Sequence, residues 1–249
     1  PGTCPWSEDK VSFYDLAYLV ALGSGPDGKA GYPMVSVYLT GQELRRIFEV
    51  QVLLAELMGD TYFLQISGAR MTYDPGRAVL LTVPFLDLPI PTTMAVLSGE
   101  LYAGEGIQDT EEYVKIKKRD QELYHVVTDY YIAAFLPMAG ELLPSLELVL
   151  KDKAGNPIEN IDEAIIYRNG RELKVWQAVL EYAADQPLNS QGHPQISSYY
   201  ADTAGRLVPI STFPPLWVWL LLALAVLAGA IYLAIRGLKK RRRSKTVQA

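Results

Sequence analysis

A run of twenty residues without a charged side chain, Leu216–Ile235, limits most strongly what this chain can fold into. As an α-helix it would be about 30 Å long, which matches the hydrocarbon core of a bilayer. Aromatic residues lie near both of its ends, where amphipathic rings favour the headgroup region. The run predicts a transmembrane helix rather than a buried helix of a soluble core. The predicted anchor residues are Leu216, Trp217, Trp219, Tyr232 and Ile235.

Charge is distributed unevenly around this run. The last fourteen residues, 236–249, contain seven basic side chains and no acidic one. Taking these seven from the 23 Lys and Arg residues leaves 16 basic against 28 acidic residues, a net charge of −12 for the chain before the tail. Because residues 216–235 are uncharged, this net charge belongs to residues 1–215, called the body below. So acidic a body argues against nucleic-acid binding, because it repels phosphate backbones.

The basic tail also predicts an orientation in the membrane. Lys and Arg residues next to a span stay on the cytoplasmic side, so we expect a single-pass protein with its body outside. Alone, the cluster would also suit a nuclear localisation or nucleic-acid patch; beside a span we favour a stop-transfer signal that contacts anionic lipid. The residues predicted to set the topology are Lys239, Lys240, Arg241, Arg242 and Arg243.

The sequence of the body predicts a mixed α+β domain, with helices packed on a mixed sheet. Residues 32–39 alternate as a half-buried strand, and Thr40 with Glu43 forms a capping-box pattern before a helix that ends at Gly59. We expect strands at 62–66, 78–83 (the second arm of a hairpin), 123–128, 146–151 and 163–167, and helices at 129–136 and 173–184. The predicted segments are an N-terminal piece (1–12), the domain (13–187), a stalk (188–215), the transmembrane helix (216–235) and the cytoplasmic tail (236–249).

Catalytic motifs are scarce. The two histidines, His125 and His193, are 68 positions apart, and Cys4 is the only cysteine, so a cysteine zinc site or a clustered two-metal site is not expected. We expect His125 to be a satisfied histidine of the core. The Gly23–Lys29 segment resembles a phosphate-binding loop but lacks the final hydroxyl residue, which favours a Pro-Asp-Gly turn. A Ser-His-Asp triad stays open, although no Gly-x-Ser-x-Gly elbow is present.

Four segments carry a resemblance to a known family. They are Val37-Tyr-Leu-Thr-Gly-Gln-Glu-Leu-Arg-Arg-Ile-Phe-Glu49, Phe63-Leu-Gln-Ile-Ser-Gly68 with Tyr73-Asp-Pro75, Tyr124-His-Val-Val-Thr-Asp-Tyr-Tyr-Ile-Ala133, and Gly170–Tyr182. Together they resemble the C-terminal domain of the 5′-nucleotidases and UDP-sugar hydrolases. In that family an N-terminal metallophosphoesterase domain carries the two catalytic metals. The C-terminal domain recognises the substrate, and two aromatic rings sandwich its base.

The resemblance implies a pocket that this chain keeps only in part. Tyr131 stands where the second stacking ring falls, with a packed core aromatic as the alternative. The first ring aligns near Leu22 and Gly23, where no aromatic residue is found, and Phe135-Leu136-Pro137 replaces the segment with the ribose-binding Asp. The candidate substrate-binding residues are Tyr131, Gly23 and Leu22.

The function implied is that of a membrane-anchored, externally facing recognition domain of a 5′-nucleotidase-like hydrolase, in a C-terminal fragment of the whole enzyme. Its expected partners are the lipid bilayer, its own N-terminal metallophosphoesterase domain, and a nucleoside or nucleotide. Divalent metals are expected only in that preceding domain, so this chain alone should not hydrolyse AMP. The alternative is a non-enzymatic surface module with a degenerate nucleotidase domain.

Overall fold

The computed structural model describes residues 11–83, 85–105, 112–142, 148–197, 205–212 and 216–246. The side chains of Leu216 and of residues 137–142 and 237–246 lie outside the described part, and with them those of Lys239, Lys240, Arg241, Arg242 and Arg243. The elements in chain order are α1 (Phe13–Val20), β1 (Met34–Thr40), α2 (Gly41–Met58), η1 (Asp60–Tyr62), β2 (Ala69–Tyr73), η2 (Pro75–Arg77), β3 (Val79–Val83), β4 (Leu88–Pro91), β5 (Val96–Tyr102), β6 (Tyr113–Lys115), β7 (Leu123–Asp129), α3 (Tyr130–Leu142), η4 (Ile161–Ala164), β8 (Tyr167–Arg168), β9 (Arg171–Glu172), α4 (Val175–Ala184), β10 (Leu207–Pro209) and α5 (Leu216–Thr246).

The chain has an α+β fold that divides into two compact units. The first unit comprises Pro1–Ile47 and Glu100–Gly205, and the second comprises Phe48–Gly99 and Arg206–Ala249. The boundaries fall within α2 and β5. The domain expected over 13–187 thus contributes to both units. Residues 205–212, expected as part of a stalk, include β10, which pairs in parallel with β2.

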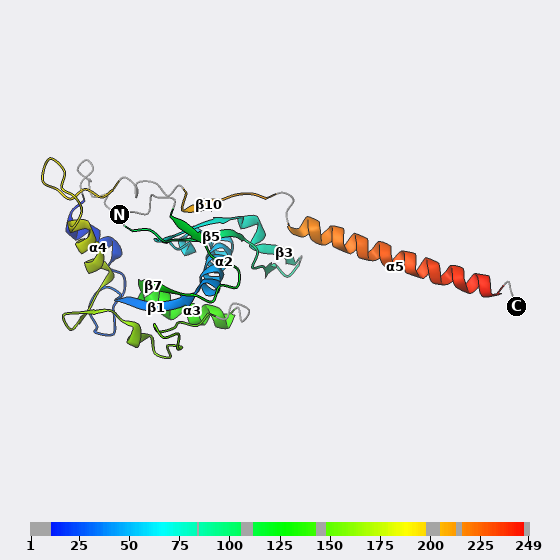
Figure 1. Ribbon diagram of the computed structural model, residues 1–249, viewed down its shortest axis with the longest axis horizontal. Helices are drawn as coiled ribbons and strands as arrows, with labels where there is room; N and C mark the ends of the chain where they lie inside the picture. The colour runs from blue at the N-terminus through cyan, green and yellow to red at the C-terminus, as the bar shows by residue number, and fades with distance from the viewer. Residues whose placement is uncertain are drawn as a thin grey trace. The chain divides into compact units, whose positions relative to one another are not determined.

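Strand β1 is the centre of the first unit. Its side chains alternate as predicted, and Val35, Val37 and Leu39 are completely buried. One edge of β1 pairs antiparallel with β7, from Met34 opposite Asp129 to Thr40 opposite Leu123, and Figure 1 shows the two strands side by side. The other edge bridges to Lys151 and Ile165. Alternation and burial on one face therefore give the strand the sequence predicts.

The predicted capping box forms at the start of α2. The Glu43 carboxylate accepts from the Thr40 backbone N–H at 2.8 Å, while the Glu43 N–H donates to the Thr40 hydroxyl at 3.2 Å. The helix ends where predicted, since the N–H of Gly59 donates to Ala55 and Gly59 has φ of +100°. A left-handed glycine after the last turn is a frequent helix terminator.

In the second unit, β10 pairs in parallel with β2, from Leu207 opposite Met71 to Pro209 opposite Tyr73. Buried Glu49 of α2 accepts hydrogen bonds from the backbone N–H groups of Ala95 and Val96, at 2.9 and 3.1 Å. Asp74, also buried, accepts from the N–H of Gly76 at 3.0 Å and from Thr212 at 2.8 Å. These carboxylates satisfy backbone donors that the loops would otherwise bury.

Several predicted strands are wrong. The segment 62–66 contains no strand: it follows the η1 turn, and the Phe63 ring packs on Tyr73 at 5.3 Å. Residues 78–83 do form β3, but β3 pairs with β4, which follows it. Leu148 and Leu150 are buried as a strand pattern requires, yet among the described residues 148–151 only Lys151 bridges to β1. Residues 161–164 form the η4 turn capped by Asn160.

The helices at 129–136 and 173–184 are confirmed as α3 and α4, and α3 extends further than predicted. The window Trp217–Arg236 of α5 has a mean hydropathy of 2.6 and none of it is buried. By length and composition this helix is able to cross a membrane.

Candidate functional site

The loop before β1 and the first turn of α3 form the candidate site, and the pairing of β1 with β7 brings them together. Met34 lies opposite Asp129 at the end of the paired strands, and the N–H of Tyr130 donates to the carbonyl of Pro33 at 2.9 Å, so Tyr32 and Tyr131 come close together just beyond the sheet. Their rings stack with centroids 5.6 Å apart and an interplanar angle of 27°. Asp129 accepts from the N–H of Ile132 at 2.8 Å and so caps the helix turn that carries Tyr131.

Leu22 and Gly23 lie at the same place. The carbonyl of Leu22 accepts from the N–H of Tyr32 at 2.8 Å. Gly23 has φ of +64°, and a Cβ added there would lie 2.1 Å from Cζ of Tyr32. The ring of Tyr32 therefore covers Gly23 closely, and a side chain at position 23 would displace it.

The structure thus brings all three predicted site residues together around Tyr32, which the sequence analysis missed. Tyr131 is 59% exposed and Leu22 is 67% exposed, whereas Tyr32 is half-buried. The packed-core alternative for Tyr131 does not describe this geometry. Whether these residues bind a substrate stays a prediction. Tyr32 could have been found only from the pairing of β1 with β7, and this pairing cannot be read from the sequence.

The two rings differ from the sandwich that the family resemblance implies. Their separation of 5.6 Å is that of one aromatic pair in direct contact, within the usual range of about 4.5–7 Å. A base stacked between the two rings would have to fit into the space between them, and two rings in direct contact leave no such space. In this conformation the exposed ring of Tyr131 instead offers a one-sided platform, supported from behind by Tyr32.

A buried ionic cluster fixes the loop that carries Leu22 and Gly23. Lys174 donates to Asp27 at 2.7 Å and to Glu172 at 2.6 Å, and its side chain is 4% exposed. The other oxygen of Glu172 accepts from the N–H of Asp27 at 2.9 Å. Gly25 provides the necessary room, since a Cβ there would lie 2.2 Å from Glu172. The Pro-Asp-Gly turn is thus tied to the start of α4.

The contacts in this cluster shift the pKa values of Asp27 and Lys174. The hydrogen bond from Lys174 lowers the pKa of the Asp27 carboxyl below its usual 3.8. Burial disfavours the charge of Lys174, but the hydrogen bonds to Asp27 and Glu172 outweigh it and raise its pKa above 10.5. Asp27 and Lys174 are therefore charged at neutral pH, and they stabilise the loop rather than exchange protons.

The histidine chemistry of the chain is modest. His125 lies on the exposed face of β7, so its predicted place in the core is wrong. Its Nε2 is 2.7 Å from the Ser36 hydroxyl, and its ring stacks on Tyr38 at 5.0 Å. Among the described residues no carboxylate bonds to His125, so the pair lacks the third group that orients a catalytic base. In the same part of the chain, no three His, Cys, Asp or Glu residues gather as a metal site.

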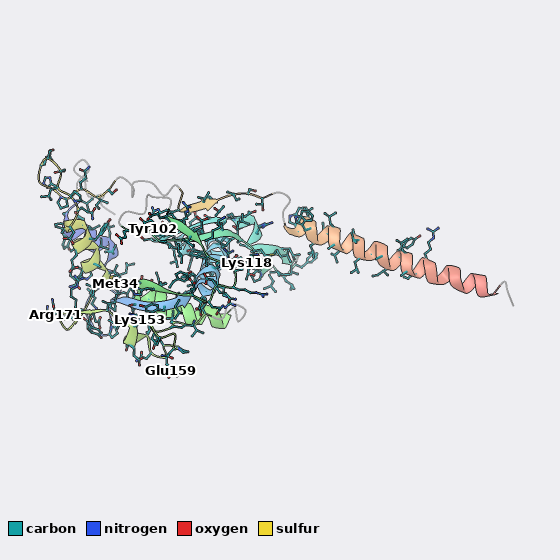
Figure 2. The ribbon with its side chains drawn as sticks, in the orientation of Figure 1. Met34, Tyr102, Lys118, Lys153, Glu159 and Arg171 are labelled. Carbon is teal, nitrogen blue, oxygen red and sulfur yellow. The ribbon has the colours of Figure 1, made fainter. Side chains whose placement is uncertain are left out.

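A separate open cavity of about 340 Å³ lies against α3 in the first unit. Glu159, labelled in Figure 2, is the one charged residue in its lining. None of the three predicted site residues lines this cavity. The cavity therefore does not extend the ring platform.

Comparisons with known proteins place the chain in a family. Residues 7–136, just over half of the chain, match the family "5′-nucleotidase, C-terminal domain". The chain belongs to that family, and its α+β fold agrees with this assignment. A search of curated proteins found no match.

Two solved structures are similar to the chain. The 5′-nucleotidase precursor of Thermus thermophilus is 18% identical with a TM-score of 0.40, and the match covers 73% of this chain and 26% of that one. The NAD nucleotidase of Haemophilus influenzae is 14% identical with a TM-score of 0.44, covering 81% of this chain and 27% of that one. This chain therefore spans about a quarter of each of these proteins, and the family assignment rests on the match over 7–136.

Proposed function

We propose that the chain is the substrate-recognition domain of a 5′-nucleotidase-like hydrolase, anchored in a membrane by α5 and facing outward. The observation that carries the recognition role is the exposed ring of Tyr131, supported by Tyr32 in a chain that belongs to the 5′-nucleotidase C-terminal family. The ligand is a nucleoside or a nucleotide. Its base lies on the free face of Tyr131, beside Leu22.

Stacking on one aromatic face is sufficient for weak recognition. Base–aromatic stacking contributes about 1–3 kcal/mol per base in single-strand binding proteins. A ring held by Tyr32 and by the capped start of α3 loses little freedom when a base settles on it. The exposed ring of Tyr131 can therefore stack with a purine or a pyrimidine base, and it does not strongly favour one over the other.

Catalysis belongs to another domain in this proposal. A metallophosphoesterase domain that precedes this chain in the whole enzyme would bind the divalent metals and activate water against the phosphate ester. The recognition domain then binds the nucleoside, and the hydrolysis of nucleotides is a property of the whole protein.

Anchoring rests on α5 and on the charge around it. The apolar window of α5 is followed by the basic tail, whose five central cations are Lys239–Arg243. Cations at this end favour a cytoplasmic tail and an extracellular or periplasmic body. Trp217 and Trp219 would then lie at the outer interface and Tyr232 near the inner one.

A second candidate function is a non-enzymatic surface module that binds no nucleotide. The direct contact of Tyr32 with Tyr131 favours it, because the slot in which relatives would enclose a base is closed by the chain's own ring. In this case the domain keeps the fold of its family and presents a surface to another ligand.

Titration with adenosine and AMP separates the two candidates. We expect the full chain in detergent micelles to bind both ligands, and Tyr131→Ala to weaken binding by roughly 5- to 150-fold, equivalent to about 1–3 kcal/mol of lost stacking. Tyr167→Ala is the matched control, since Tyr167 is also 59% exposed but lies on β8. Calorimetry or ligand-observed NMR measures the affinities.

Equal affinities of Tyr131→Ala and the unaltered chain would remove Tyr131 from the site. If the unaltered chain binds neither ligand, the surface module is the better description.

A further inference from the structure

The tip of the β3–β4 hairpin exposes large apolar side chains. Phe85 is fully exposed, Leu86 is 73% exposed and Leu88 is 58% exposed. Asp87 is the only charged residue between Val79 and Pro91. Exposed apolar side chains gathered in one place mark a surface that contacts another apolar phase.

The backbone of the tip points to an occupant other than a β-strand. Pro89 and Pro91 lie in β4 and have no N–H to donate, so β4 is a poor template for a further strand. Phe85 and Asp87 have φ of 71° and 47°, a left-handed conformation that is rare for a bulky residue such as Phe85. The tip therefore displays side chains rather than hydrogen-bonding edges.

The hairpin lies at the start of α5, within the second unit. Both the N–H and the hydroxyl of Thr212 donate to Asp74, the residue that precedes η2 and the hairpin. Leu216 follows Thr212 by four residues, so the first turn of α5 begins within about 14 Å of this tie. In agreement, β3 contacts α5, and Figure 1 shows the hairpin beside the N-terminal end of that helix.

We propose that the hairpin tip, Phe85–Leu88, inserts into the outer headgroup region of the bilayer beside α5. The inference rests on the proposed span of α5. Trp217 and Trp219 belong to the same end of the helix, and they mark the depth of the interface. The tip would give the second unit a second contact with the membrane, so that the unit does not depend on its connection to α5 alone.

The chemistry of the tip selects a neutral lipid surface. Insertion draws on apolar area, because no Lys or Arg lies between Val79 and Pro91. Attraction to anionic headgroups needs such cations. The tip should therefore insert fully in vesicles of phosphatidylcholine alone. Adding phosphatidylserine should not increase the insertion.

A fluorescent label at the tip tests the inference in the full chain. Cys4, the only cysteine, is replaced by serine, and Leu86→Cys carries an environment-sensitive NBD group. Met58→Cys is the matched control, since Met58 is an apolar residue of the same unit that is 55% exposed. In phosphatidylcholine vesicles we expect blue-shifted emission and quenching by nitroxide-labelled lipids at position 86, and water-like emission at position 58.

A second variant confirms the cause of the shift. Phe85→Asp combined with Leu88→Asp changes only exposed side chains, and we expect it to return the emission at position 86 to its value in water. Water-like, unquenched emission at position 86 would overturn the inference if the chain stays in the vesicles at alkaline pH. Release at alkaline pH would overturn the span of α5 and the inference with it. A shift that lipid nitroxides do not quench, and that disappears at low protein-to-lipid ratio, would assign the tip to a second copy of the chain instead.

Discussion

Three charged side chains decide the position of the loop that carries the candidate site. Lys174 is almost completely buried between the carboxylates of Asp27 and Glu172, and each of its contacts is shorter than 3 Å. The charges compensate one another at a place where a single unpaired charge would be costly. Because the N–H of Asp27 also bonds to Glu172, the cluster fixes backbone as well as side chains.

Removing the cation should therefore open the loop. We expect Lys174→Met to destabilise the loop by about 3 kcal/mol, since it leaves the buried carboxylate of Glu172 without a cation beside it. Hydrogen exchange of residues 22–32, followed by mass spectrometry, should become faster. Lys153→Met is the control, because Lys153 lies in an exposed turn (Figure 2), and unchanged exchange is expected there.

The same cluster predicts a pH dependence. The lowered pKa of Asp27 means that its stabilisation is present above about pH 3.8 and is lost as the pH falls through the lower folded value. The raised pKa of Lys174 means that its share is present below about pH 10.5 and is lost as the pH rises further. After correction for intrinsic exchange rates, protection of the loop should be constant between these limits. Loss of protection between pH 5 and 8 would contradict this account.

At the scale of elements, the buried Glu43 connects the start of α2 with the segment after α3. Its carboxylate accepts from Thr40 as a capping box requires, and also from the N–H of Val149 and the ammonium of Lys151. Burial alone would raise the pKa of Glu43, but the hydrogen bonds from Lys151 and Thr40 lower it. Glu43 thus stabilises both the first turn of α2 and the segment 149–151, in which Lys151 bridges to β1.

Truncating this residue should be costly, and truncating an exposed residue of the same helix should not. We expect Glu43→Ala to lower the free energy of unfolding by about 3 kcal/mol, because the half-buried Lys151 loses its anionic partner and two backbone donors lose their acceptor. Glu56→Ala is the control on the exposed part of α2 and should stay within about 0.5 kcal/mol. Urea unfolding of the full chain, followed by circular dichroism, compares the two. Similar midpoints for both variants would refute the role of Glu43.

At the scale of the whole molecule, two features proposed for the membrane act at opposite ends of α5. The basic tail would decide which way the helix crosses, and the apolar hairpin tip would contact the lipid on the other side. The acidic charge of the body, −12 before the tail, suits a surface outside the cell. The chain belongs to the 5′-nucleotidase C-terminal domain family, and it spans about a quarter of each of the two similar solved structures.

The orientation can be tested by removing the tail charges. We expect Gln at Lys239, Lys240, Arg241, Arg242 and Arg243 to reduce the fraction of molecules whose body is digested by a protease added outside intact cells or spheroplasts. Five exposed cations of the body, changed to Gln in the control, should leave this fraction unchanged: Lys115, Lys117, Lys118, Arg119 and Lys153. An equal effect of both changes would show that overall charge, not the tail, sets the orientation.

Local patterns in the sequence were sufficient for β1, for α2 with both of its ends, for β7 and for the apolar window of α5. Each of these elements depends on contacts within a few residues or on a simple periodicity of apolar side chains, and both can be read directly from the sequence. The segments 62–66 and 163–167 show the limit, since their apolar residues suit a strand, but residues 63–66 are irregular and Glu163 and Ala164 belong to the η4 turn.

The sequence by itself determined the family of the protein, through the segments between residues 37 and 133, and it predicts a membrane span through the apolar run and the basic tail. Only the tertiary structure decided the composition of the candidate site. Tyr32 and Tyr131 are 99 positions apart, and they stack because the pairing of β1 with β7 brings the loop before β1 next to the first turn of α3. Lys174 joins Asp27 across 147 positions for the same kind of reason. Such pairings depend on which strands meet, and this is a property of the folded chain as a whole.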